Sequence, residues 1–263
     1  MEVSERFARL VQGPEDGLAL DEACLLVAAH FRPGVDVGAE IARIDDLAAG
    51  VEQATFDGVV GHLCRQLGFR GDTATYADPD NSFLDRVLDR RCGIPITLSI
   101  LAMEVGRRRG VPVAGVGLPG HFLIADGAPR DVFADLFSGG VALDRAGCVA
   151  LFHHIQGPDA HFVDAFLAPT GPRAIVARVL ANLRAGAVAR GDRRSLLAGA
   201  ELRALLPESA AEVTDGRELA GALAALGRFG DAAAVLEASA KRAAGSDADR
   251  LAVQARRLRA RLN

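Results

Sequence analysis

The hydrophobic residues of the first 67 positions recur at the spacing of helix faces. Between residues 37 and 49, for example, Ile41, Ile44 and Leu47 share one face, whereas Glu40 and Arg43 lie on the other. Glycine, proline and aspartate then interrupt the pattern between residues 68 and 81, which predicts a loop. The pattern predicts three helices, over residues 18–31, 37–49 and 51–67.

A longer apolar helix is predicted in the middle of the chain, over residues 95–109. Pro95 suits the first helical position, where the missing amide proton costs nothing. The segment from Ile96 to Val105 is apolar on nearly all sides, which is typical of a helix in the centre of a domain. Three arginines followed by Gly110 predict its C-terminal end. A shorter helix over residues 83–91, capped by Asn81 or Ser82, should precede it.

Three strands should follow this helix, over residues 111–118, 121–125 and 131–137. In the third strand Phe133, Asp135 and Phe137 alternate onto one face. A carboxylate between two aromatic residues needs a partner, because an unpaired buried charge costs several kcal/mol. His121, at the start of the neighbouring strand, is the expected partner of Asp135.

After residues 169–172 (PTGP) the composition shifts to alanine, leucine and arginine without a strand pattern, and we place a domain boundary between residues 168 and 169. The dipeptides Gly191-Asp192 and Gly230-Asp231 precede alanine-rich segments, which indicates two repeated helix pairs. Stacked helix pairs expose a groove that suits a protein or peptide partner, or they simply extend the core. The expected helices cover residues 173–189, 194–206, 217–226, 232–243 and 248–262.

The charge and hydropathy of the chain exclude several classes of partner. The formal net charge is −4, and the basic residues are scattered, so nucleic acid is not an expected partner. No apolar run reaches the length of a membrane span, and the first ten residues include four charged ones. These features predict a cytoplasmic protein with no membrane partner.

The cysteine and histidine spacing predicts neither disulfides nor a metal site. Cys24, Cys64, Cys92 and Cys148 are far apart, so each is expected to be a free thiol, and the three other than Cys92 are expected to pack in the core. His153 lies in a cluster of histidines and aspartates that matches no known ligand spacing. We expect no cofactor and no metal.

The residues 81–140 carry a resemblance to a known family. The combination R-R-x-G-I-P-I-T-L-S followed by P-G-H-F-L resembles the core of the SirB-type bacterial family of transglutaminase-like proteins. The leading helices and the repeat-like tail are similar to the flanks of that family, whose tail resembles degenerate tetratricopeptide repeats. The resemblance implies an α+β fold with a papain-like core, in which a central helix packs on an antiparallel sheet. The predicted organisation is therefore a transglutaminase-like domain with its leading helices over residues 1–168 and a helical tail over residues 169–263.

The resemblance also implies site residues. In catalytically active relatives a cysteine begins the central helix, a histidine lies on one strand and an aspartate on the next. His121 and Asp135 match the histidine and the aspartate, with Leu136 in place of the usual proline. The expected cysteine position falls near Pro95, and Cys92 lies three residues earlier.

Two functions remain open from the sequence. Because Cys92 is displaced, the first is a non-catalytic or weakly catalytic protein that acts through interaction with a protein partner. The alternative is an acyl transferase or hydrolase that uses Cys92, His121 and Asp135. Thiol catalysis needs a thiolate, and Arg90, Arg91 and the following helix start would favour one at Cys92.

Overall fold

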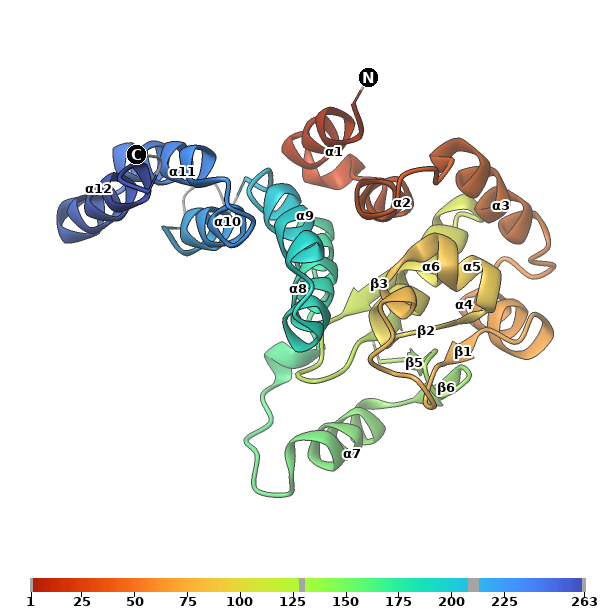
Figure 1. The fold of residues 1–263 in the computed structure, drawn as a ribbon. Coiled ribbons are helices and arrows are strands. Elements are labelled where there is room, and N and C mark those ends of the chain that lie inside the picture. The colour runs from red at the N-terminus through yellow and green to blue at the C-terminus, as the bar shows by residue number, and fades with distance from the viewer. Residues whose placement is uncertain (1, 128–130, 208–212, 262–263) are drawn as a thin grey trace. The chain divides into compact units, whose positions relative to one another are not determined.

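The computed structural model describes residues 2–127, 131–207 and 213–261 (Figure 1). Its elements include α1 (Val3–Gln12), α2 (Leu20–Phe31), α3 (Val37–Ala49), α4 (Phe56–Val60), the π-helix η2 (Gly61–Gln66), β1 (Arg70–Gly71), the 3₁₀ helix η3 (Pro79–Ser82), α5 (Leu84–Arg90), β2 (Cys92–Gly93), α6 (Pro95–Arg108), β3 (Val113–Val116), β4 (Leu123–Asp126), β5 (Phe133–Asp135), β6 (Val141–Leu143), α7 (Arg145–Gln156), α8 (Pro172–Arg190), α9 (Arg193–Arg203), α10 (Val213–Ala225), α11 (Phe229–Arg242) and α12 (Gly245–Arg259).

The chain forms two compact units, Glu15–Val179 and Met1–Pro14 with Leu180–Asn263. This division differs from the predicted boundary between residues 168 and 169. The proline-bearing segment 169–172 marks the start of α8 and not a change of unit, because Pro172 occupies the first position of that helix. The boundary between the units falls within α8 instead.

The helix α6 forms the centre of the unit Glu15–Val179. Its residues from Pro95 to Ala102 are all buried, as the apolar sequence predicts. Two residues after the end of α6, Gly110 has a φ of 68°, a left-handed conformation that glycine adopts without strain. The helices α2, α3, α4 and α5 pack against α6, and so do the strands β3 and β4. The unit is therefore an α+β core with a buried central helix.

The sheet of this unit has four antiparallel strands in the order β3-β4-β5-β6. Gly115 pairs with Ile124, Ile124 pairs with Ala134, and Asp135 pairs with Val141. Three of these strands were expected; β3 and β5 are about half as long as predicted, and β4 begins two residues later than predicted and ends one residue later. The short strands reflect prolines and glycines at their ends, which interrupt regular pairing.

Two further strands, β1 and β2, form a separate parallel pair of two residues each. Arg70 pairs with Cys92 and Gly71 with Gly93. The pair is extended by the amide of Asp72, which donates to the carbonyl of Gly93. It joins the loop after η2 to the segment that leads into α6, and it places Cys92 on a strand.

The predicted caps of α5 are not used as caps. Phe83 is the N-cap residue, and Asn81 and Ser82 end the preceding η3. Asn81 is fully buried, its side-chain Nδ2 donates to the backbone carbonyl of Thr75, and its backbone carbonyl accepts a hydrogen bond from the Thr97 hydroxyl. Asn81 therefore ties the loop before α5 to the first turn of α6.

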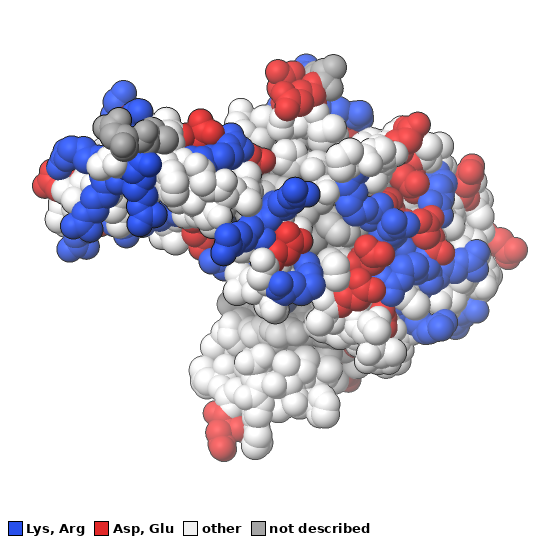
Figure 2. Space-filling model, in the orientation of Figure 1, with Lys and Arg blue, Asp and Glu red and all other residues white. Residues whose placement is uncertain are grey.

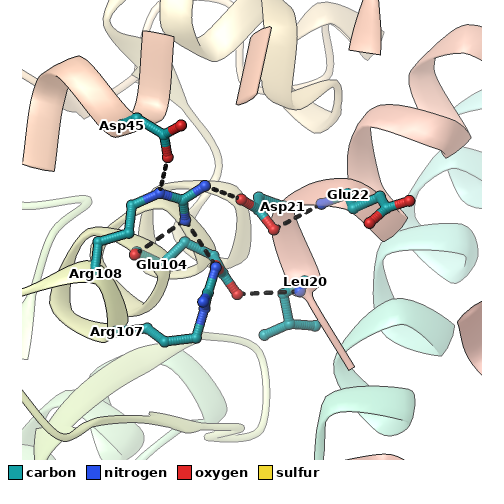
Figure 3. A network of polar contacts seen from close by, with 7 residues as sticks. All are labelled: Leu20, Asp21, Glu22, Asp45, Glu104, Arg107 and Arg108. Carbon is teal, nitrogen blue, oxygen red and sulfur yellow. Dashed lines mark hydrogen bonds and ion pairs between the residues drawn. The ribbon is translucent and has the colours of Figure 1, made fainter. Parts of the chain in front are cut away.

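A buried polar network connects the N-terminal helices to the central helix (Figure 3). Arg108 at the end of α6 contacts Asp21 of α2 at 2.5 Å, Asp45 of α3 at 2.5 Å and Glu104 at 3.0 Å. Glu104 also accepts the amide proton of Leu20 at 3.0 Å. One arginine thus contacts carboxylates from three helices.

The second unit is helical, and neighbouring helices from α9 to α12 pack on one another. Its core includes Leu223, Leu236 and Leu251. The two Gly-Asp steps are not equivalent: Asp192 caps α9 through the amides of Arg194 and Ser195, whereas Asp231 lies inside α11. The tetratricopeptide-like repeat stays a prediction. Leu262, the predicted end of the last helix, lies outside the described residues.

Candidate functional site

His121 lies in a tight turn and not on a strand, because β4 begins two residues later at Leu123. Gly120 has a φ of 77°, and the His121 amide donates to the carbonyl of Leu118 at 2.9 Å. The His121 side chain is 10% exposed, so its ring is close to the surface but largely enclosed. The turn Pro119-Gly120 therefore fixes the position of the imidazole.

Arg178 of α8 forms hydrogen bonds with the backbone of this turn. Its Nη2 donates to the carbonyl of His121 at 2.6 Å and to the carbonyl of Leu118 at 3.2 Å. The guanidinium also lies over the ring of Phe122, 5.4 Å from the ring centre. Burial lowers the pKa of Arg178, although that arginine stays charged at neutral pH. Sequence reasoning missed this residue, because it assigned Arg178 to the helical tail.

Asp135, the last residue of β5, faces the His121 ring. The predicted contact is present: Nε2 of His121 lies 3.0 Å from Oδ1 of Asp135. Nε2 is also buried without a well-aligned hydrogen bond, so the contact is a close electrostatic one whose N–H direction is poor. It leaves Nδ1 as the ring nitrogen that can serve another group.

Asp135 is held as a carboxylate by its surroundings. Oδ1 accepts the amide protons of Phe137 and Ser138 at 3.0 and 3.3 Å, and Oδ2 accepts the Ser138 hydroxyl proton at 2.7 Å. Burial acts to raise the pKa of Asp135, but the contact with His121 and the Ser138 hydrogen bonds outweigh it, and the pKa is lowered. The carboxylate is thus charged at neutral pH and oriented by its own turn.

Aromatic rings stand beside the His121 and Asp135 pair. Phe137, which was expected on the third strand, lies just beyond β5, and its ring centre is 6.0 Å from that of His121 and 5.7 Å from that of Tyr76. The Gly71 amide donates to the Phe137 carbonyl at 2.9 Å. A Cβ atom at Gly71 would come within 2.4 Å of the Phe137 ring, so only glycine permits this approach. The site therefore depends on β1 as well as on the main sheet.

Cys92 lies on β2, three residues before the start of α6 at Pro95. It is the partly exposed cysteine of the chain, whereas the other three are buried. Within the described residues its sulfur makes no hydrogen bond, either to His121 or to another group. Arg90 pairs with Asp72 at 2.9 Å, and Arg91 donates to the carbonyl of Leu67, so both arginines bind other groups. The structure brings His121 and Asp135 together and does not join Cys92 to them.

The remaining cysteines are held in the thiol form. Burial raises the pKa of Cys64 and of Cys148 to about 11 in each case, and burial raises the pKa of Cys24 even further. Each is therefore a poor nucleophile at neutral pH. Among residues 2–127, 131–207 and 213–261, no three histidine, cysteine, aspartate or glutamate side chains gather as a metal site would require.

The fold and the site together define a class of protein. An antiparallel sheet against a buried central helix, with a histidine and an aspartate in contact at the sheet, is the arrangement that the sequence resemblance implies. Residues 37–181 match the family model of the transglutaminase-like superfamily, and this match covers more than half of the chain. The chain belongs to that superfamily.

Bacterial relatives define the group more closely. The chain is 33% identical over 184 residues to a UPF0162 protein of Xylella fastidiosa, a match that spans 64% of the chain and 65% of that relative. It is 31% identical over 193 residues to a UPF0162 protein of Pseudomonas aeruginosa, with 70% of each chain covered. The chain is therefore a member of the UPF0162 family, and it matches just under two thirds of the length of the Xylella relatives.

A eukaryotic protein is similar to about half of the chain. The mouse F-box only protein 21 is 31% identical over 142 residues, which cover 51% of this chain and 22% of that protein.

No helix among the described residues is both long enough and apolar enough to span a membrane.

Proposed function

We propose that this protein is a non-catalytic or weakly catalytic transglutaminase-like protein of the cytoplasm that acts by binding a protein partner through its C-terminal helical unit. One observation carries the proposal: the helix-start position expected for the nucleophile is occupied by Pro95, which has no nucleophilic group. The contact between His121 and Asp135 is then a stabilising element of the turn and sheet, with no nucleophilic thiol beside it among the described residues.

The position of Cys92 supports this proposal. The strand β2 pairs Cys92 with Arg70, and this pairing holds the Cys92 backbone three residues before the start of α6. A working thiol needs hydrogen-bond reach to an imidazole. Cys92 has no such bond within the described chain.

A second candidate is an acyl transferase or hydrolase that depends on Cys92. Two features favour it: Cys92 is the partly exposed thiol, and the Nδ1 atom of His121 is free of Asp135, which contacts Nε2. In this mechanism the thiolate would attack an acyl carbon, His121 would take the thiol proton and pass it to the leaving group, and Asp135 would orient the ring.

Thiol labelling distinguishes the two candidates. Iodoacetamide is added to the folded protein near neutral pH, and the rate at Cys92 is measured by peptide mass spectrometry in the parent, in His121→Ala and in His153→Ala, a histidine of α7 outside the site. The proposal expects the same slow rate in all three proteins. Fast labelling that slows only in His121→Ala would contradict it and favour the enzyme.

Turnover and partner binding provide the second test. The purified protein is assayed with amide, ester and thioester substrates, in parallel with Cys92→Ala. The proposal expects no difference between these two proteins and expects a protein partner to co-purify with the intact chain. Turnover that disappears in Cys92→Ala, without any co-purified partner, would refute it.

A further inference from the structure

A groove on the C-terminal unit lies between α10 and α12, with Leu236 of α11 at its floor. Its volume is about 360 Å³. The lining residues of α10, and those of α12 together with Arg261 just beyond it, recur at positions i, i+3, i+4 and i+7, which is one helix face over about two turns. The lining consists of Arg217, Ala220, Gly221, Ala224, Leu236, Gln254, Arg257, Leu258 and Arg261.

The floor of the groove is apolar and its side chains are small. Ala220 and Leu236 are buried, and Ala224 and Leu258 are partly buried. A Cβ atom added at Gly221 would meet nothing within 4 Å, so this part of α10 stands open. Aliphatic side chains of a partner would find apolar surface here to cover.

The charges at the groove are basic and poorly neutralised. Arg217, Arg257 and Arg261 line it, and no carboxylate does so among the described residues. Arg257 has no hydrogen bond or ion pair within the described part of the chain. Arg217 approaches Asp247 only to 3.9 Å, and its Nε is buried without a hydrogen-bond partner. Arg261 lies over the ring of Phe229, 5.5 Å from its centre. Basic side chains gather over the region of α11 and α12 (Figure 2).

A second hollow in the same unit shows the opposite pattern. It is lined by arginines that have acidic partners within the hollow itself: Arg184 contacts Glu218 at 2.8 Å, and Arg203 contacts Asp215 at 3.4 Å. The unit can therefore neutralise an arginine that it uses structurally. Among the described residues, by contrast, Arg257 of the groove between α10 and α12 has no carboxylate partner and Arg217 has only a distant one, so their charge is available to an external anion.

We infer that this groove binds an acidic peptide segment of a partner protein, whose aliphatic side chains cover the apolar floor while its carboxylates pair with Arg217, Arg257 and Arg261. This inference rests on the proposed function and names the partner chemistry of the C-terminal unit. Arginine binds carboxylates through paired, charge-assisted hydrogen bonds, and peptide recognition by arginine clusters is a common binding mode.

The lining favours a peptide over other anionic partners. Single-stranded nucleic acid needs aromatic platforms for its bases, and no aromatic residue lines the groove within the described chain. A membrane surface would need large apolar side chains that project outward, whereas the apolar residues here form a recessed floor.

A designed probe tests the inference. The probe is a labelled amphipathic peptide of about 14 residues, or four helical turns, with leucine on one face and glutamate beside it; a matched peptide carries lysine in place of glutamate. Binding to the full-length protein is measured by fluorescence anisotropy at low and high salt. Variants are Arg257→Glu and Gly221→Leu, which place an opposite charge at the groove and fill it. Arg256→Glu is the matched control, because this exposed neighbour on α12 lies outside the groove.

The inference expects the acidic peptide to bind at least about tenfold more tightly than the basic one, with binding that weakens as salt rises. Arg257→Glu and Gly221→Leu should each weaken it about tenfold or more, and Arg256→Glu should leave it within about twofold. Three results would overturn it. The first is an equal loss of binding in Arg256→Glu and Arg257→Glu, and the second is the absence of saturable binding. The third is displacement of the peptide by single-stranded DNA or anionic lipid vesicles more readily than by excess unlabelled peptide. Circular dichroism of each variant verifies that the helices are intact.

Failure here is distinguishable from failure of the proposed function. If the peptide does not bind while the protein still lacks turnover and co-purifies with a partner, only the groove assignment is wrong. If turnover depends on Cys92 and no partner co-purifies, the proposed function is wrong whatever the peptide does.

Discussion

Replacing Arg108 with methionine removes the cation that joins three helices (Figure 3). The Arg108 side chain is 13% exposed, and those of Asp21 and Glu104 are 2% and 4% exposed. Methionine retains much of the length of the side chain and can pack where the arginine stem lies. The substitution therefore mainly deletes charge and hydrogen bonds, and it leaves two buried carboxylates close together.

The expected cost follows from this burial. Removing one partner of a buried charge pair costs about 3–5 kcal/mol, because the other charge is left uncompensated. Arg107→Met is the matched control: Arg107 also contacts Glu104, at 2.8 Å, but it is 56% exposed. Loss of the exposed Arg107 leaves Glu104 paired with Arg108 at 3.0 Å, so this loss should cost only about 0–1 kcal/mol. With an ordinary total stability of about 5–15 kcal/mol, Arg108→Met should be severely destabilised and Arg107→Met nearly normal.

The cost should also depend on pH. Burial, and then the charge of Asp21, raise the pKa of Glu104 in the folded protein. A carboxyl whose folded pKa is raised contributes stability that is present below its unfolded pKa and is lost as pH rises through the folded pKa. The charge and hydrogen bond of Arg107 act to lower this pKa, and Arg108, Asp21 and Asp45 are the other charges around Glu104. Because Arg108 contacts Glu104 at 3.0 Å, loss of its charge should raise the pKa of Glu104 further. The free-energy cost of Arg108→Met should therefore be smaller at about pH 5 than at about pH 8.

Urea unfolding followed by far-ultraviolet circular dichroism measures the effect, since the chain has no tryptophan and a single tyrosine. Amide hydrogen exchange of α6 assigns the loss to the unit Glu15–Val179 and not to the C-terminal helices. If Arg108→Met costs no more than Arg107→Met, or if its cost is the same at both pH values, the reasoning about the buried network is refuted.

Two further substitutions probe the site near His121. Asp135→Ala removes the acceptor of two backbone amides and one hydroxyl, and it should lower the free energy of unfolding by about 3–4 kcal/mol in urea titrations. Asp135→Asn keeps the side-chain shape and should cost about 1–2 kcal/mol; equal costs for the two would contradict the role of the carboxylate. Gly71→Ala forces the Phe137 ring to move and should cost about 1–3 kcal/mol, with a shift in the NMR signals of His121. Unchanged stability and unchanged His121 signals would show that the close approach of Gly71 is unimportant.

The sequence by itself determined the local elements whose signals lie within one short segment. It predicted the helix at Val37–Ala49 with its observed bounds, and it predicted α6 from Pro95, a continuous apolar surface and Gly110. It also predicted the contact of His121 with Asp135, because a carboxylate in an apolar strand requires a nearby partner. These inferences succeed because capping, periodicity and the cost of a buried charge act over a few residues.

Short elements and irregular ones were not predicted. The pair of β1 and β2 has two residues per strand, which is too few for an alternating pattern. The helix expected over residues 51–67 is instead α4 followed by a π-helix, and α7 was not anticipated. The predicted His121 strand became a turn because the glycine before it takes a left-handed conformation.

Only the tertiary structure decided how residues distant in sequence meet. Arg178 supports the His121 turn across 57 residues, and Arg108 reaches Asp21 across 87. Cys92 follows the same logic: its sequence neighbours suggested an activated thiol, yet β1 holds its backbone and Asp72 binds Arg90. Local patterns specify which side chains need partners, whereas the topology of the chain selects the partners. That selection brings His121 and Asp135 into contact and gives the Cys92 sulfur no hydrogen bond within the described residues.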